Sequence, residues 1–226
     1  MNVIETKSLS KVYPGAIDVV ALNEVDLVIE KGEFTAIVGP SGSGKTTLLN
    51  IIGGLDSASS GSVIVAGEDI CTMKENKLIN FRLHNIGFVF QAYNLIPVLT
   101  AKENVEFIMM MQKWDKQKRE ERSTSLLKSV GLAEQIDKRP MQMSGGQQQR
   151  VAVARALASK PQFVLADEPT ANLDSKSTKN LLDIMARLNK EEETTFVFST
   201  HDQRVIDRAR RVITLEDGQI VSDERR

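Results

Sequence analysis

Short apolar runs alternate with amphipathic stretches along much of the chain, and this alternation predicts an α/β fold. The apolar run Phe34–Val38 predicts a strand, and after a glycine-rich loop the segment "KTTLLNIIGGL" predicts a helix that ends at Gly53–Gly54. Two further β-rich runs, in residues 163–169 and 195–202, lie on either side of the helical stretch "TKNLLDIMARLNKE". Strands that alternate with helices favour a parallel sheet.

Two other regions depart from this alternation. Tight turns at Ala66–Gly67 and Asp217–Gly218 predict antiparallel hairpins. Between Gln91 and Gln142 the β-rich runs disappear, and residues 103–132 have a helical pattern throughout. We interpret this region as a helical subdomain inserted into the α/β core.

The composition argues against several classes of protein. With 41% apolar residues, the 226-residue chain can bury a substantial core. Its 29 basic and 30 acidic residues leave a formal net charge of −1, so no overall field attracts the molecule to nucleic acid or to an anionic membrane. The single cysteine, Cys71, excludes an intramolecular disulfide and a cysteine-clustered zinc site, and it fits a reducing compartment such as the cytoplasm. No apolar run approaches the ~20 residues that span a bilayer, so we expect any membrane role to come through a partner.

A phosphate-binding motif follows the first predicted strand. Gly39, Gly44, Lys45 and Thr46 match the P-loop pattern G-x-x-x-x-G-K-[ST] between a strand and a helix. In such a loop the backbone N–H groups and the helix N-terminus surround a β-phosphate, the lysine reaches the β- and γ-phosphate oxygens, and the threonine hydroxyl ligates Mg²⁺. A dinucleotide-binding loop is a poorer match, because it needs glycine where Thr47 stands, beside the α-phosphate. We expect nine consecutive residues to form the phosphate loop: Gly39, Pro40, Ser41, Gly42, Ser43, Gly44, Lys45, Thr46 and Thr47.

Two carboxylates end the predicted strand "FVLADE". Asp167 is placed to join the Mg²⁺ shell, and Glu168 to polarise a water for in-line attack on the γ-phosphate. A second interpretation of Glu168, as a strand-end acid that only caps the next segment, stays open.

The carboxylate pair Asp167 and Glu168 favours nucleotide hydrolysis over two alternative functions. A nucleotide kinase would need an acceptor site, of which the sequence shows no trace, and a GTPase would carry Asn-Lys-x-Asp, which "NKLI" at 76–79 does not complete.

The SGGQ segment, Ser144–Gln147, begins another helical stretch. Ser144 and Gln147 fit a capping box, which satisfies the free N–H groups of a helix start. Two glycines in a first turn nevertheless weaken a helix, by up to roughly 1 kcal/mol each, and a cap does not require them. Close approach of a phosphate does, because Gly145 and Gly146 expose their backbone N–H groups. Since the phosphate loop already holds one phosphate, we expect the SGGQ segment to bind the γ-phosphate held by another subunit.

With the P-loop, "ADE" and "MSGGQ" in this order, the sequence resembles the nucleotide-binding subunit of an ATP-binding cassette (ABC) protein over nearly all of its length. The resemblance implies that Tyr13 stacks on adenine and that Gln91 senses Mg²⁺ and the attacking water. It also implies that Asp174 lies in a loop that crosses to the partner subunit and that His201 contacts the γ-phosphate. Met143 replaces the usual leucine before SGGQ, a volume-conserving change that should be tolerated.

The resemblance also implies the architecture. We expect a single domain, residues 1–226, with a P-loop NTPase parallel-sheet core, an N-terminal antiparallel β subdomain and an inserted helical subdomain. Residues 1–90 and 145–226 would form the core with its β subdomain, and residues 91–144 the helical subdomain that carries the SGGQ segment at its end.

The expected activity is Mg²⁺-dependent ATP hydrolysis, which drives a membrane machine through a head-to-tail homodimer that ATP closes and hydrolysis reopens. Integral membrane permease subunits would hold the chain at the cytoplasmic face of the inner (cell) membrane. The expected catalytic residues are Lys45, Gln91, Glu168 and His201, and the expected Mg²⁺ ligands are Thr46, Gln91 and Asp167.

The motifs "NIIGGLD" and "GFVFQAYNLIPVLTAKENV" look most like the macrolide-export and lipoprotein-release branch, which also resembles the cell-division cassette. The competing function is that of a soluble cassette that acts on nucleic acid or ribosomes. It is disfavoured because the short interval between Thr47 and Ser144 holds no coiled coil or zinc module, and because the chain has one cassette. We therefore expect no direct nucleic-acid partner. A membrane partner used for signalling or cell-wall regulation, and the identity of any transported substrate, stay open.

Overall fold

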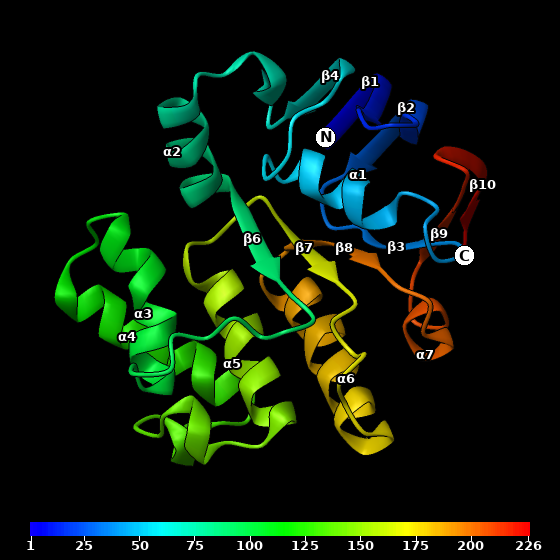
Figure 1. Cartoon of the computed structure of the whole chain (residues 1–226). Coiled ribbons are helices and arrows are strands. Elements are labelled where there is room, and N and C mark those ends of the chain that lie inside the picture. The colour runs from blue at the N-terminus through cyan, green and yellow to red at the C-terminus, as the bar shows by residue number, and fades with distance from the viewer.

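A computed structural model describes residues 1–226 and contains two β-sheets that flank helix α1 (Lys45–Ile52) (Figure 1). The larger sheet has six strands in the order β10-β9-β3-β8-β7-β6, and all neighbouring strands are parallel except β10 and β9. Its strands are β3 (Phe34–Val38), β6 (Ile86–Val89), β7 (Phe163–Asp167), β8 (Thr195–Ser199), β9 (Arg211–Glu216) and β10 (Gln219–Arg225). The predicted parallel sheet is confirmed.

The smaller sheet is antiparallel, in the order β2-β1-β4-β5. Its strands are β1 (Asn2–Tyr13), β2 (Val19–Glu30), β4 (Ser60–Val65) and β5 (Glu68–Asp69). Both predicted hairpins form, and each turns on two residues with positive φ: Ala66 and Gly67 between β4 and β5, and Asp217 and Gly218 between β9 and β10. Positive φ at both central positions is typical of the type I′ turn, whose twist matches that of the strands.

The remaining helices lie mostly beyond the opposite face of the large sheet, where the α3–α4 pair projects to one side (Figure 1). They are α2 (Glu75–Asn85), α3 (Ala101–Met111), α4 (Lys116–Ser129), α5 (Gly145–Ala158), α6 (Ser175–Glu191) and α7 (Gln203–Ile206), with 3₁₀ turns at Ile70–Thr72, Ala133–Gln135 and Pro140–Gln142. The expectation that residues 103–132 are helical throughout is wrong, because the helix breaks between α3 and α4. Lys113 takes a φ of +62° after the end of α3. Asp115 then caps the start of α4 by accepting hydrogen bonds from the amides of Gln117 and Lys118.

Two apolar clusters lie on the two faces of the large sheet. One joins the antiparallel sheet, α1 and side chains such as Ile37 and Leu165 of the large sheet. The other joins sheet residues such as Phe196 to α5, α6 and the α3–α4 pair, so Val105 and Leu127 belong to the same core as the sheet. No helix is long and apolar enough to cross a membrane.

Candidate functional site

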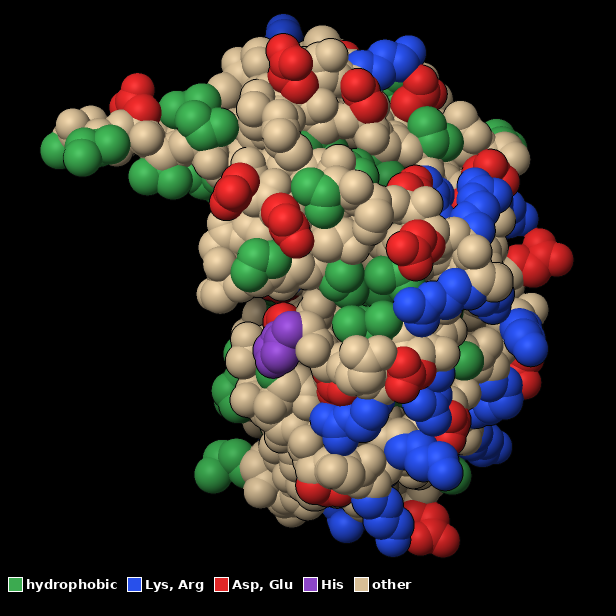
Figure 2. Space-filling view, turned by 90° about the vertical axis from the view of Figure 1, so that its right-hand side faces the viewer, with side chains coloured by type: hydrophobic (Ala, Val, Ile, Leu, Met, Phe, Trp, Pro, Cys, Tyr) green, Lys and Arg blue, Asp and Glu red, His purple; other side chains and the backbone are tan.

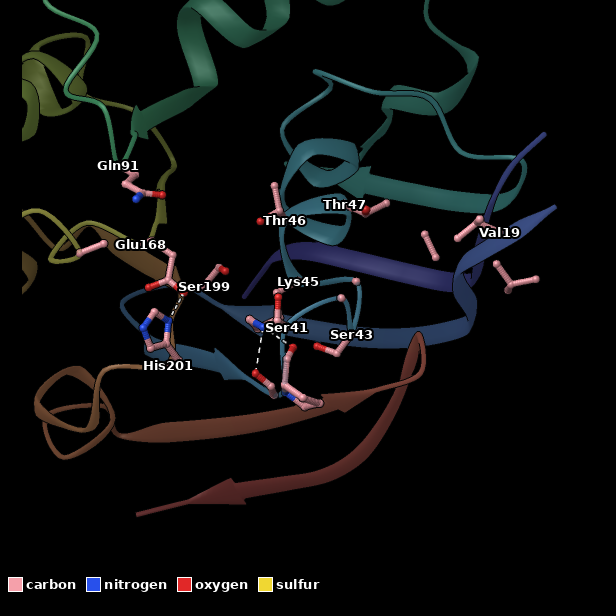
Figure 3. A pocket seen from close by; sticks show the side chains of 17 residues that line it. Val19, Ser41, Ser43, Lys45, Thr46, Thr47, Gln91, Glu168, Ser199 and His201 are labelled. Atoms are coloured by element: carbon pink, nitrogen blue, oxygen red, sulfur yellow. Dashed lines mark hydrogen bonds and ion pairs between the residues drawn. The ribbon is translucent and has the colours of Figure 1, made fainter. Parts of the chain in front are cut away.

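The carboxyl ends of β3, β7 and β8 open onto a cavity of about 680 Å³ (Figure 3). All nine residues of the phosphate loop, Gly39–Thr47, line it, together with Gln91, Glu168 and His201. Ligands bind at this edge in open α/β sheets, because loops from several parallel strands meet there. Five further lining residues were not anticipated from the sequence: Val19, Val20, Ala21, Ala171 and Ser199.

The phosphate loop presents unpaired donors to the cavity. Gly44 begins helix α1 with a φ of +99°, and no side chain caps this helix start. Its first amides are therefore free to bind an anion, and the helix dipole favours one. The Ser43 hydroxyl is buried without a hydrogen-bond partner, which is costly unless a ligand satisfies it. Lys45 is buried, and its ammonium donates to the carbonyls of Gly39 (2.9 Å) and Pro40 (2.8 Å).

Gly39 has no room for a side chain. Its φ is +148°, and a Cβ atom there would overlap the backbone carbonyl oxygen of Leu215 on β9. Glycine is therefore required at this position by close packing of two backbone segments. The packing of the phosphate loop against β9 is what holds its amides around the cavity.

A pair of oxygen donors lies beside the loop. The Thr46 hydroxyl donates to the Asp167 carboxylate, with distances of 3.1 and 3.3 Å to its two oxygens. A threonine hydroxyl and one carboxylate, completed by waters and phosphate oxygens, are typical protein ligands of Mg²⁺. The residues present thus fit the expected metal.

Glu168 has a strained backbone at the end of β7. Its φ is +45°, and its amide donates to the carbonyl of Ser199 (2.9 Å). Left-handed backbone in a residue with a side chain costs energy and often occurs at functional sites. Its Oε1 atom lies 2.7 Å from Nδ1 of His201 (Figure 3). The Glu168 side chain is 18% exposed and that of His201 is 75% exposed, so the carboxylate lies deeper than the ring.

Asp202 fixes the loops that carry this pair. It accepts a hydrogen bond from the Thr170 hydroxyl (2.9 Å), which ties the loop after β8 to the loop after β7. The adjacent Arg204 guanidinium, by hydrogen bonding to the carboxylate, lowers the pKa of Asp202 to about 2. Asp202 was not anticipated from the sequence, because its partner lies on a different loop.

Gln91 lines the cavity from the segment that follows β6. The backbone around it is held by three side chains that sequence reasoning missed. Asn172 donates to the Gln91 carbonyl (3.1 Å), Gln149 to the Phe90 and Pro169 carbonyls, and Arg155 to the carbonyls of Tyr93 and Asn94. Gln149 and Arg155 follow the SGGQ segment on α5, but their sequence position does not reveal which distant carbonyls they bind.

Besides Asp167, which contacts the lining residue Thr46, three groups of expected site residues lie outside the cavity lining. The Tyr13 hydroxyl instead donates to Asp56 (2.7 Å), although Tyr13 pairs across the hairpin with Val19, which does line the cavity. Asp174 caps α6, where it accepts a hydrogen bond from the Ser177 hydroxyl (2.6 Å) that lowers the pKa of its carboxyl. The SGGQ segment forms the expected capping box between Ser144 and Gln147.

The two glycines of the SGGQ segment also have a packing role. A Cβ atom on Gly145 would lie 2.7 Å from the Tyr93 hydroxyl oxygen, and one on Gly146 would lie 2.9 Å from the Ser177 hydroxyl oxygen. Phosphate approach is therefore not the only reason for these glycines. The second contact places the SGGQ segment beside the start of α6, where Asp174 lies.

Comparison with known sequences shows the family. Residues 22–171 match the family model described as ABC transporter. The ABC transporter ATP-binding protein YxdL of Bacillus subtilis is 42% identical over 222 residues, which cover 98% of this chain and 86% of that protein. A Methanocaldococcus jannaschii protein named uncharacterized ABC transporter ATP-binding protein MJ1508 is 47% identical over 219 residues, 96% of this chain and 97% of that protein.

Two further matches are to a protein named for macrolide export and to a cassette solved as a dimer. The macrolide export ATP-binding/permease protein MacB of Pasteurella multocida is 44% identical over 97% of this chain, which spans 34% of that longer protein. A solved structure, a dimeric post-hydrolysis state of the ATP-binding cassette MJ0796 bound to ADP and Pi, superposes with a TM-score of 0.90, at 42% identity and 98% coverage of both chains. The chain therefore belongs to the ABC transporter family, as one of its ATP-hydrolysing cassettes.

Proposed function

We propose that this cassette binds the phosphates of ATP in the 680 Å³ cavity and hydrolyses the γ-phosphate there with Glu168 as general base. The observation that carries the proposal is the convergence of a complete phosphate loop with Glu168 and His201 on one cavity. Lys45 neutralises the β- and γ-phosphates, and the loop amides surround the β-phosphate. His201 both holds the Glu168 carboxylate and contacts the γ-phosphate, and Gln91 orients the attacking water.

Thr46, Asp167 and Gln91 would hold a Mg²⁺ ion at this site. The bound ion supplies a Lewis acid that neutralises charge on the β- and γ-phosphate oxygens. The close approach of the Thr46 hydroxyl to the Asp167 carboxylate supports this assignment. Thr46 would supply its hydroxyl from the start of α1, and Asp167 its carboxylate from the end of β7.

A second copy of the chain completes the site. The SGGQ segment and Asp174 lie together but outside the cavity, so their donors need a nucleotide held elsewhere. A head-to-tail dimer places the SGGQ segment of one copy on the γ-phosphate in the other, which makes ATP part of the interface. The ADP- and Pi-bound dimer of the similar cassette MJ0796 supports this arrangement.

Integral membrane subunits receive the motion of this dimer. We assign residues 91–144 to the lobe that contacts them at the cytoplasmic face of the membrane, and residues 1–90 and 145–226 to the ATPase core. The similarity to MacB, named as both an ATP-binding and a permease protein, supports a permease partner.

Direct nucleic-acid binding fits the surface less well. Basic side chains gather on the face with α7 and β10, but several are paired with carboxylates, as in Arg208–Asp183 and Arg225–Glu30 (Figure 2).

The substitution Glu168→Gln tests the proposed base and the dimer together. It removes the carboxylate and keeps the size of the side chain, so the variant should bind ATP–Mg²⁺, lose hydrolysis by about 10²–10⁴-fold, and accumulate as a dimer in size-exclusion chromatography. Glu224→Gln, an exposed residue on β10, is the matched control and should behave like the unmodified protein. A Glu168→Gln variant that binds ATP and stays monomeric would contradict the composite site, and one that hydrolyses ATP normally would contradict the base.

A further inference from the structure

A cluster of three polar side chains lies outside the cavity, where the end of β1 meets the loop after α1. The Lys11 ammonium donates to the Asp56 carboxylate (2.7 Å) and to the Ser57 carbonyl (2.6 Å). The Tyr13 hydroxyl donates to the other oxygen of the same carboxylate (2.7 Å). The ammonium also lies over the Tyr13 ring, 4.8 Å from its centroid, which is a cation–π contact.

This cluster is more enclosed than surface ion pairs usually are. The Lys11 side chain is 10% exposed and that of Asp56 is 28% exposed. Burial alone raises the pKa of the Asp56 carboxyl, but hydrogen bonds from Lys11, Tyr13 and the Ser57 amide outweigh it and leave the pKa below its ordinary value. Burying a charged pair costs desolvation energy, so its retention next to an exposed ring calls for a reason beyond simple packing.

Fastening β1 to the following loop is not a sufficient reason, because other groups already do so. The Ser59 hydroxyl accepts a hydrogen bond from the amide of Val12 (3.0 Å), and the Ser59 amide donates to the carbonyl of Ser10 (2.9 Å). Lys11 and Asp56 therefore add little to the attachment of the backbone. Apart from the Lys11 hydrogen bond to the Ser57 carbonyl, their side-chain contacts join them to each other and to the Tyr13 side chain.

These contacts immobilise the Tyr13 ring and leave one face available. Its hydroxyl is held by Asp56, one face is covered by Lys11, and the residue is still 40% exposed. Tyr13 pairs with Val19, and Val19 lines the phosphate cavity. A flat group attached to the phosphates in that cavity can thus reach the open face of a ring that is already ordered.

We infer that Lys11 and Asp56 are positioning residues that hold the Tyr13 ring as a platform for the base of the bound nucleotide. The inference rests on the proposed function, in which the phosphates occupy the cavity, and on the expectation from the family resemblance that Tyr13 receives the base. Base–aromatic stacking pays less ordering entropy when the ring is fixed in advance. Lys11 and Asp56 therefore raise the part of the ATP affinity that comes from the base, and they leave the part that comes from the phosphates unchanged.

Equilibrium binding of ATP and of inorganic tripolyphosphate, which has no base, tests the inference. Tyr13→Ala removes the ring and gives the largest loss expected from stacking. If stacking is worth ~1–3 kcal/mol, ATP affinity should fall by about 5- to 150-fold. Two variants leave the ring in place but remove a group that holds it: Lys11→Met, which keeps the aliphatic stem, and Asp56→Ala. Each should lower ATP affinity by about 3- to 10-fold, because only part of the stacking energy is lost. In both of these variants the affinity for tripolyphosphate and the kcat at saturating ATP should stay unchanged. Lys11→Arg retains the charge and should recover most of the loss.

The two ligands separate failure of this inference from failure of the proposed function. If the unmodified protein binds neither ligand, the proposed function fails. If it binds both and the variants weaken both equally, or leave ATP affinity unchanged, the positioning role is wrong and the proposed function stands. Tripolyphosphate binding also reports whether each variant is folded. Should Lys11→Met not fold, Tyr13→Phe keeps the ring, lacks the hydroxyl, and gives the same comparison.

Discussion

The phosphate loop and the SGGQ segment are both glycine-rich and both begin a helix, but they present their donors differently. Helix α1 begins at Gly44 without a side-chain cap, and the loop before it is folded around a cavity. Helix α5 begins at Ser144 with a complete capping box, and its first residues lie outside that cavity. The phosphate loop surrounds a cavity and has free hydrogen-bond donors. In the SGGQ segment, by contrast, some of the backbone N–H groups are already bonded to its own side chains.

This difference shows what each segment can do within one chain. The phosphate loop can bind an anion alone, because all of its residues line one cavity, the start of α1 has no side-chain cap, and the buried Ser43 hydroxyl has no partner. In the SGGQ segment the Gln147 amide is capped by Ser144, so the amides of Gly145 and Gly146 remain for a ligand. Such a small donor set needs a phosphate that is already held by another site.

Lys45→Met should separate the two segments most strongly. It removes the ammonium that lies within the phosphate loop, so ATP binding by the monomer and hydrolysis should both fall, with kcat lower by on the order of 10²–10³-fold. Equilibrium ATP binding at a protein concentration that keeps the chain monomeric is the measurement. Lys179→Met, an exposed residue on α6, is the control. Undiminished monomer affinity in Lys45→Met would contradict the claim that the phosphate loop binds ATP alone.

Alanine at one glycine of each segment should affect stability unequally. In Gly39→Ala the new Cβ atom meets the Leu215 backbone in a left-handed conformation, so we expect a loss of about 3 kcal/mol or more. In Gly145→Ala it meets only the hydroxyl end of Tyr93, which can move, and alanine favours the helix, so the change should stay within about 1 kcal/mol. Chemical denaturation measures both. Equal losses would show that the two glycines are equally constrained by packing.

The sequence predicted the phosphate loop because all of its residues are consecutive and its flanking strand and helix have clear patterns. Strand β3 has the predicted bounds, and β7 and β8 begin at the predicted residues but end before the polar residues that close each predicted run. The contacts around Gln91 were not predictable. Arg155 and Gln149 bind backbone carbonyls far away in the chain, and any residue type supplies a carbonyl.

Where the backbone is irregular, fewer structural features could be predicted from the sequence. The long strands β1 and β2 were not delimited, because bulges interrupt their alternation and both Ser8 and Glu24 have positive φ. The break between α3 and α4 was missed because no glycine or proline marks it, and Lys113 adopts a positive φ instead. Tyr13 was expected at the adenine from resemblance alone, and its bonds to Lys11 and Asp56 have no signature in sequence spacing.

Ser144→Ala should have a small effect on stability and tests whether the second segment acts only in the dimer. Loss of the hydroxyl that caps the Gln147 amide should cost about 1 kcal/mol, or roughly 2–4 °C in Tm. Asp115→Ala is a matched control, since it removes the cap of α4 and should cost a similar amount. Only Ser144→Ala should slow ATP hydrolysis, because in the proposed dimer only its hydroxyl would face the phosphate of another copy. If both variants slow hydrolysis equally at matched loss of Tm, the capping box is the whole role of Ser144 and the composite site loses one donor.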